Sequence, residues 1–414
     1  MDKQHTDLVE DCVRKLQSGI ALVDVCVTRG LMVQGGRGLV VQGGRGWCTT
    51  FCLGKKWYTN PVPPVPPNPV PPVPPPKLNI VIWARSESRA ALAGEFKRIP
   101  PVLDDMAQVV GTHAPVVDEA DERGLQKALA KGGACLVKTK SQGVGLLAAG
   151  SSAAHTTAAL LVLEKSAKVY WEAELLGGAK PIKRREAWLM HLVYKRKYSQ
   201  MESKAVHQTL EDFTRKIPAD EMAARQAIIK TGLSLLEKNL VQGTWGNISL
   251  RLDEQFMLVT PSGLEYDLLT PFDIVRVNLH TQEYEGKLKP TSEKIIHAEL
   301  LKSKPGVNCV IHSHPVNCSS FAAAHKPVVA PDEASRELLG GDATLAKYAL
   351  PGSKRLAKNA LAALKQSQAC IMENHGMLVC GTSLDDALKK CETLERLAGS
   401  HIDGLVSEPQ GRGN

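Results

Sequence analysis

The sequence has no apolar run long enough to cross a membrane and no paired cysteines. A membrane helix needs about 18 to 20 consecutive apolar residues, and no stretch of this 414-residue chain reaches that length. Residues 1–5 are polar and no apolar segment follows them, which argues against a secretory signal. The ten cysteines are scattered singly, without a CxxC pair, as is typical of thiols in a reducing compartment. We therefore expect a cytoplasmic protein with no membrane partner.

Five cysteines in apolar sequence are predicted to be buried thiols: Cys309, Cys318, Cys370, Cys380 and Cys391.

The composition is that of a globular chain with room for two domains. Hydrophobic residues make up 43% and charged residues 23%, and the length exceeds that of one ordinary domain. The net charge is +8, and its densest part, 183–197, carries aromatic residues among the cations. That mixture suits nucleic-acid binding or a solvated helix face or linker. No nucleic-acid motif accompanies it, so we favour the second interpretation and expect no nucleic-acid partner.

The first 78 residues differ from the rest of the chain. Apolar residues at helical spacing predict an N-terminal helix within residues 1–29. A glycine-rich hexamer at 33–38 then recurs at 41–46, and 11 of the 16 residues from 61 to 76 are proline. Such proline density removes most backbone donors and favours polyproline II. Residues 30–78 are therefore expected to be unfolded.

Two α/β units follow. The patterns predict a partial domain at 79–182, a basic linker at 183–204, a complete domain at 205–402 and a flexible tail at 403–414. The short apolar strand at 134–137, the polar turn after it and the helix that follows are echoed from 369 onward. A spacing of more than 200 residues indicates duplicated domains and not a solenoid, with the first copy truncated.

Three histidines form a candidate metal site. His312 and His314 end an apolar run that reads as a buried strand, and alternate residues of a strand point to the same side. His375 follows a second predicted strand, at 369–372, and a glycine beside it permits a sharp turn. Three imidazoles with one open position are typical of a catalytic zinc site.

A carboxylate opens the helix that precedes the histidine pair. Thr291 or Ser292 is the predicted N-cap, which places Glu293 in the first turn. A carboxylate there interacts favourably with the helix dipole, and beside a metal it is equally suited to general acid–base chemistry.

Two glycine-containing turns complete the set, at 243–249 and 260–263. Each combines backbone N–H groups with hydroxyls or an amide, so together with the helix N-terminus at 291–292 they could bind a phosphate. Taken singly, each is also a common kind of turn.

The order of these motifs, Gly-Thr-x-Gly-Asn-x-Ser, Thr-Pro-Ser-Gly, Ser-Glu, His-x-His-Pro and Asn-His-Gly, resembles the class II aldolase/adducin family over residues 205–402. That family includes zinc-dependent aldolases of fuculose and rhamnulose phosphate and ribulose-phosphate 4-epimerase. The resemblance implies an α/β/α sandwich around a central, largely antiparallel sheet, assembled as a homo-oligomer. It implies zinc ligands at His312, His314 and His375, and an acid–base role for Glu293. It implies a phosphate site at Thr244, Asn247, Ser262, Gly263, Thr291 and Ser292.

The implied reaction is the reversible aldol cleavage of a small phosphorylated ketose in carbohydrate metabolism. The family's epimerases carry aspartate where this chain has Glu293, which favours cleavage. Two alternatives remain. One is an epimerase, dehydratase or decarboxylase on the same metal scaffold, and the other is an adducin-like binding protein, although such a protein has no need of three histidines. Iron, manganese or cobalt also suits three imidazoles.

The chain departs from the family pattern in two places. The fuculose-type aldolases supply a tyrosine from a neighbouring subunit, and residues 328–333 contain none. Residues 99–182 resemble the back half of the family domain, but 138–143 hold no histidine. The first unit is therefore expected to be a degenerate copy without a metal.

Overall fold

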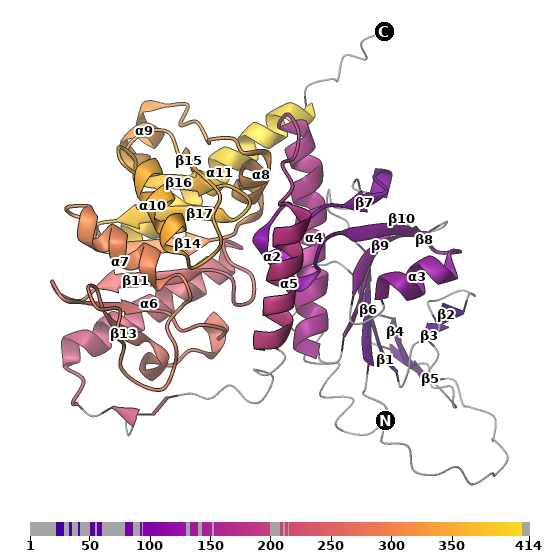
Figure 1. Cartoon of the computed structure of the whole chain (residues 1–414), viewed down its shortest axis with the longest axis horizontal. Helices are drawn as coiled ribbons and strands as arrows, with labels where there is room; N and C mark the ends of the chain where they lie inside the picture. Colours follow the sequence, from indigo (N-terminus) through magenta and orange to yellow (C-terminus); the bar gives the residue numbers. More distant parts are fainter. Residues whose placement is uncertain are drawn as a thin grey trace. The chain divides into compact units, whose positions relative to one another are not determined.

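The computed structural model describes residues 92, 94–129, 133–139, 143–150, 153–198, 208–209, 212–213 and 215–407, together with strands between residues 22 and 85. The chain divides into two compact units (Figure 1). The first unit comprises residues 1–171 and 182–194, and the second comprises 172–181 and 195–414.

The first unit contains a six-stranded sheet in the order β1-β6-β10-β9-β8-β7. Neighbouring strands are antiparallel except β8 and β9, which are parallel. Its strands are β1 (Leu22–Thr28), β6 (Asn79–Arg85), β7 (Arg98–Ile99), β8 (Ala114–Asp118), β9 (Ala134–Thr139) and β10 (Gly143–Gly150). Its helices are α2 (Asp104–Val109) and α3 (Glu122–Leu129), followed by α4 (Ala153–Leu175) and α5 (Arg184–Tyr198), which both continue into the second unit. Two short hairpins pair β2 (Val33–Gln34) with β3 (Val40–Val41) and β4 (Thr50–Leu53) with β5 (Lys56–Thr59).

The second unit contains a seven-stranded sheet in the order β13-β12-β11-β14-β17-β16-β15. Its strands are β11 (Asn247–Arg251), β12 (Phe256–Val259), β13 (Val275–Asn278), β14 (Cys309–Ser313), β15 (Thr344–Ala346), β16 (Ala369–Met372) and β17 (Gly376–Gly381). Its helices are α6 (Ala219–Glu237), α7 (Lys294–Ser303), α8 (Val316–Ala324), α9 (Glu333–Leu339), α10 (Lys354–Ala363) and α11 (Leu384–Ser407), with two 3₁₀ turns, η3 (Tyr266–Leu268) and η4 (Pro271–Asp273). All strand pairs are antiparallel except β15 and β16.

Helices cover both faces of this second sheet (Figure 1). Helices α7 and α10 pack on each other and on one face, where Val310, Leu378 and Met372 belong to one buried apolar cluster with Leu300 and Leu356. Helices α6, α8 and α11 pack on the other face. The predicted sandwich around a largely antiparallel sheet is thus confirmed for the described residues of the second unit.

The two sheets share a strand order. In the first unit β6-β10-β9-β8 has the same sequence of antiparallel, antiparallel and parallel pairs as β14-β17-β16-β15 in the second. This is what a duplicated domain would produce, and the duplication itself stays a prediction.

The structure differs from the predicted segments in three places. Residues 22–28 form strand β1 within the predicted N-terminal helix, and residues 1–21 lie outside the described part. Four short strands occur within 30–78, where an unfolded segment was expected, while the proline run at 61–76 lies outside the described residues. The predicted basic linker at 183–204 is helix α5 over most of its length, because 184–198 contains neither glycine nor proline to interrupt it. The other predicted domain boundaries stay predictions.

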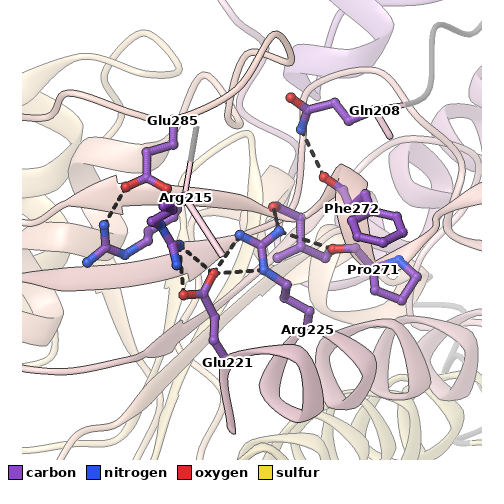
Figure 2. Close-up of polar contacts among 9 residues, drawn as sticks. Gln208, Arg215, Glu221, Arg225, Pro271, Phe272 and Glu285 are labelled. Atoms are coloured by element: carbon purple, nitrogen blue, oxygen red, sulfur yellow. Dashed lines mark hydrogen bonds and ion pairs between the residues drawn. The ribbon is translucent and has the colours of Figure 1, made fainter. Parts of the chain in front are cut away.

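A buried ion cluster attaches α6 to the loop after β12 (Figure 2). Arg225 is fully buried and donates to the Glu221 carboxylate, with Nε–Oε1 at 3.0 Å and Nη2–Oε1 at 2.7 Å. It also donates to the carbonyls of Pro271 and Ile274. Arg215 contacts both oxygens of Glu221, at 2.8 and 2.7 Å. Each buried charge therefore has opposite charge and hydrogen bonds around it, as burial requires.

The five predicted buried thiols are confirmed, and Cys135 is a sixth. Burial raises the pKa of Cys309 and Cys380 to about 12, which makes them poor nucleophiles. Among the described residues, no helix is both long and apolar enough to span a membrane.

Candidate active site

Three imidazoles meet at the ends of adjacent strands in the second unit. His312 lies on β14, His314 directly follows it, and His375 lies in the connection from β16 to β17. The Nε2 atoms of His314 and His312 are 2.7 Å apart, and those of His312 and His375 are 3.0 Å apart. All three rings are buried. The prediction that His312 and His314 point to one side is confirmed.

Close packing of the two strands brings His375 to the pair. Strand β14 pairs with β17, with His312 opposite Leu378. A Cβ on Gly376 would lie 2.5 Å from the Ser313 carbonyl oxygen and 2.8 Å from Cδ2 of His314, so only glycine fits. The sequence predicted a sharp turn beside His375, and the residue with the left-handed conformation there is Asn374, with φ of 55°. The Asn374 amide supports that conformation by donating to the Lys180 carbonyl at 2.6 Å.

The local hydrogen bonds suit a metal ion. His312 Nδ1 lies 2.8 Å from the Met377 carbonyl oxygen and must donate to it, which leaves the Nε2 lone pair pointing toward the other rings. Ligand atoms of the three histidines all lie within 4.8 Å of one another. A cluster of converging lone pairs is unfavourable without a cation between them, so these residues fit a divalent metal.

Glu293 lies beside the three rings. Its Oε2 is 3.1 Å from His312 Nε2, and its Oε1 is 3.3 Å from His375 Nε2. Burial by itself would raise the pKa of this carboxyl, but the neighbouring imidazoles of His312 and His375 more than offset it, and the pKa is lowered well below its usual value. The side chain is therefore an anion at neutral pH.

The N-cap prediction for this helix was wrong. Glu293 is itself the N-cap of α7, with φ of −96° and ψ of 11°, and not a residue of its first turn. The Glu293 N–H is instead directed at Thr291 Oγ1, 3.3 Å away. The Thr-Ser pair thus forms the turn before the helix, which places the carboxylate at the helix entrance beside the histidines.

The three segments predicted to bind phosphate lie side by side. Thr260 N donates to the Ile248 carbonyl at 3.0 Å, and Thr291 N donates to the Thr260 carbonyl at 3.1 Å. Ser262 N donates to the Lys289 carbonyl at 3.0 Å. The turns at 243–249, 260–263 and 289–293, distant in sequence, are therefore neighbours.

Residues of these segments differ in exposure. Thr244, Gly263 and Ser292 are exposed and Ser262 is half-buried, whereas Thr291 and Asn247 are buried. The Asn247 amide donates to Glu293 Oε2 at 3.0 Å, so at most one of its hydrogens remains for a phosphate oxygen.

His297 is a further polar residue of the site, and sequence reasoning missed it. It is fully buried on α7, with Nδ1 2.7 Å from Ser249 Oγ and Nε2 in contact with Asn247 Oδ1. The signal that could have found it is its spacing, four residues after Glu293, which places both side chains on one face of a helix.

Comparisons with known proteins identify a family. Residues 226–402 match the model of the Class II Aldolase and Adducin N-terminal domain. The L-fuculose phosphate aldolase of Escherichia coli K12 is 34% identical over 187 residues, which is 45% of this chain and 86% of that protein. A 5-methylthioribulose-1-phosphate/5-deoxyribulose-1-phosphate aldolase of Rhodospirillum rubrum is 32% identical over 195 residues, covering 47% and 87%. A solved structure of an L-fuculose 1-phosphate aldolase has 30% identity and a TM-score of 0.43, covering 47% of this chain and 90% of that one.

Proposed function

This chain belongs to the class II aldolase/adducin family, and on that premise we propose that its second unit is a class II sugar-phosphate aldolase that cleaves a small phosphorylated ketose. The observation that supports this most is the meeting of three buried imidazole nitrogens with one ionised carboxylate, 3.1 and 3.3 Å from two of them. The relatives named above act on fuculose, methylthioribulose and deoxyribulose phosphates, so a ketose phosphate is the substrate class to test.

We assign His312, His314 and His375 as ligands of a divalent metal, with zinc as the first choice. A divalent cation at this position supplies a Lewis acid for the carbonyl and hydroxyl oxygens of the ketose. The contact of His312 Nδ1 with the Met377 carbonyl orients that ring, and close packing at Gly376 fixes the distance between β14 and β17.

Glu293 is the group that moves the proton. Cleavage between two carbons leaves the electron pair on the carbon beside the ketose carbonyl, and a positioned carboxylate can deliver or remove the proton there. Because its pKa is lowered, Glu293 is deprotonated at neutral pH and is available to accept a proton from the ketone fragment in the synthetic direction.

The substrate phosphate is proposed to bind where the three turns meet. The Ser262 and Ser292 hydroxyls and the backbone N–H groups of Gly263 and Ser292 are the proposed donors, with Thr244 beside them; the Ser262 N–H is already bonded to the Lys289 carbonyl. Helix N-termini favour anions. Asn247 and Thr291 complete the set, each with part of its side chain already engaged within the protein.

Metal content and turnover test this function together. We expect about one metal per chain in the wild type, loss of that metal in His314→Ala, and aldehyde release from ketose phosphates by the wild type only. Glu293→Gln is expected to retain the metal and lose turnover, because it keeps the shape and removes the base. A folded wild type that binds no metal, even with zinc added, would contradict the aldolase assignment and favour an adducin-like binding protein.

A further inference from the structure

We propose that His297 is a positioning residue that acts through Asn247 to fix Glu293, so that Oε1 is the carboxylate oxygen that transfers the proton. This inference rests on the proposed function and deepens it. It concerns a fully buried histidine that is not among the three converging rings.

The register of one strand against one helix creates the contact. Asn247 and Ser249 are alternate residues of β11, so their side chains point to the same face of the sheet. Glu293 and His297 are four residues apart at the start of α7, so they share one face of that helix. Asn247 contacts both Glu293 and His297, and Ser249 contacts His297.

The chemistry of these groups gives the hydrogen bonds one direction. Asn247 Oδ1 can only accept, so His297 Nε2 must carry the hydrogen that reaches it. A neutral imidazole has only one N–H, so His297 Nδ1 accepts the hydroxyl hydrogen of Ser249 at 2.7 Å. The chain therefore runs from the Ser249 hydroxyl through His297 and Asn247 to Glu293 Oε2.

Both ends of the chain fix the orientation of the Asn247 amide. If the amide were reversed, Oδ1 would face the ionised Glu293 oxygen and lose a hydrogen bond, and the NH₂ would face the His297 N–H. Burial lowers the pKa of His297 to about 3, so the ring is neutral near pH 7. Its single N–H, on Nε2, therefore keeps donating to the Asn247 oxygen.

The consequence for Glu293 is a difference between its two oxygens. Oε2 accepts the hydrogen bond from Asn247 at 3.0 Å. Oε1 is buried, accepts no hydrogen bond from the described part of the chain, and lies 3.3 Å from His375 Nε2. With Oε2 fixed, the carboxylate cannot rotate freely, and Oε1 is the oxygen with capacity for a substrate proton.

Substitution of His297 tests this role kinetically. His297→Phe keeps a planar ring but has no N–H, and we expect kcat to fall about tenfold to a hundredfold with KM and metal content unchanged. His297→Gln places an N–H near the position of Nε2 and is expected to recover most of that loss. Ile296→Ala is the matched control, since it loosens the same helix through the apolar core and should lower stability without this kinetic pattern.

A second measurement does not depend on turnover. In protein with ¹⁵N-labelled histidines, the His297 signal, identified by its absence in His297→Gln, should show a protonated Nε2 and an unprotonated Nδ1 from pH 5 to 8.

The two measurements separate the two proposals. The opposite tautomer or a charged ring would overturn the positioning role whatever the activity, as would wild-type kcat in His297→Phe. A wild type that turns over no ketose phosphate would overturn the proposed function, and the ring signal would still decide whether the hydrogen-bond chain exists.

Discussion

At the scale of single residues, this site combines an ionised carboxylate, Glu293, with a neutral imidazole, His297, and both side chains are buried. Glu293 has its pKa lowered despite burial, and His297 has its pKa lowered because of burial. The first shift keeps Glu293 negatively charged, and the second keeps His297, four residues later, neutral. That separation lets one residue act as a base while the other remains a hydrogen-bond donor.

His297 should make the folded state sensitive to acid. A free histidine titrates near pH 6.5, and the buried ring titrates near 3. Between these values the unfolded chain binds a proton that the folded chain does not, so stability falls as the pH decreases from 6.5 toward 3, by at most about 1.4 kcal/mol per pH unit. Urea unfolding at pH 7 and pH 5 should show that the free energy of unfolding depends less on pH in His297→Gln than in the wild type. An equal change between the two pH values in both proteins would contradict this expectation.

Asn247 should be needed for turnover but not for metal binding. Asn247→Ala removes the donor to Glu293 Oε2, so kcat is expected to fall about tenfold to a hundredfold while elemental analysis still finds the metal. Loss of the metal in this variant would show that Asn247 serves the histidines and not the carboxylate.

At the scale of secondary-structure elements, close contacts between strands and helices position these residues. Strand β14 carries His312 and ends one residue before His314. It lies at the centre of the sheet, between β11 and β17. Its neighbours on each side bring Asn247 and His375 to the same place. Helix α7, which packs on one face of the sheet, contributes its N-cap residue Glu293 and, four residues later, His297.

Gly376 should tolerate no side chain. In Gly376→Ala the new Cβ would meet the Ser313 carbonyl and the His314 ring, so we expect a loss of about 1 to 3 kcal/mol of stability and weaker metal binding. Gly404→Ala is the control, because that exposed glycine of α11 has open space around it and alanine is the better helix former. Thermal unfolding and metal titration of the two variants test this expectation. Equal melting temperatures and equal metal affinities in Gly376→Ala and Gly404→Ala would contradict it.

The buried ion cluster at α6 should contribute strongly to the stability of the folded state (Figure 2). Glu221→Ala leaves Arg225 buried without its carboxylate partner, which typically costs about 3 to 5 kcal/mol. Burial would raise the pKa of Glu221, but hydrogen bonds from Arg215 and Arg225 lower it overall, so its contribution is present above its unfolded pKa and is lost as the pH falls through the folded value. Lys302→Ala, which breaks the more exposed Lys302–Glu299 pair, should change the urea midpoint little.

At the scale of the whole molecule, the two sheets share part of their strand order, and the three-histidine cluster lies in the second unit. The relatives cover about half of this chain, and the family model matches only residues 226–402. Among the described residues, one group of three or more metal-ligating side chains is present, and it lies in the second unit. The stretch at 138–143, which the predicted duplication matches with the Asn-His-Gly turn, has no histidine.

The full chain should therefore bind one divalent metal and not two. Metal titration of the wild type is expected to saturate at about one equivalent, and His375→Ala should abolish it. Saturation at two equivalents, or a remaining equivalent in His375→Ala, would show that residues of the first unit also bind metal.

Much of the second unit could be predicted from local sequence patterns. Strand alternation placed His312 and His314 on one side, and the apolar runs predicted β14 and β16 and the burial of Cys309 and Cys370. Basic charge was a weaker guide: the sequence predicted a linker over 183–204, and residues 184–198 form a helix. Charge density alone does not oppose helix formation when good helix formers lie between the charges.

The contacts between polar groups could not be predicted from these patterns, because they depend on how the strands and helices pack. His297 looks like an ordinary helix residue until β11 brings Asn247 and Ser249 against it. The turn at His375 is a second case, because Asn374 takes the left-handed conformation and, two residues later, Gly376 lies where a Cβ would meet the neighbouring strand. Pairings of this kind depend on strand register and on helix placement across some fifty residues of sequence, and local propensity carries no information about either.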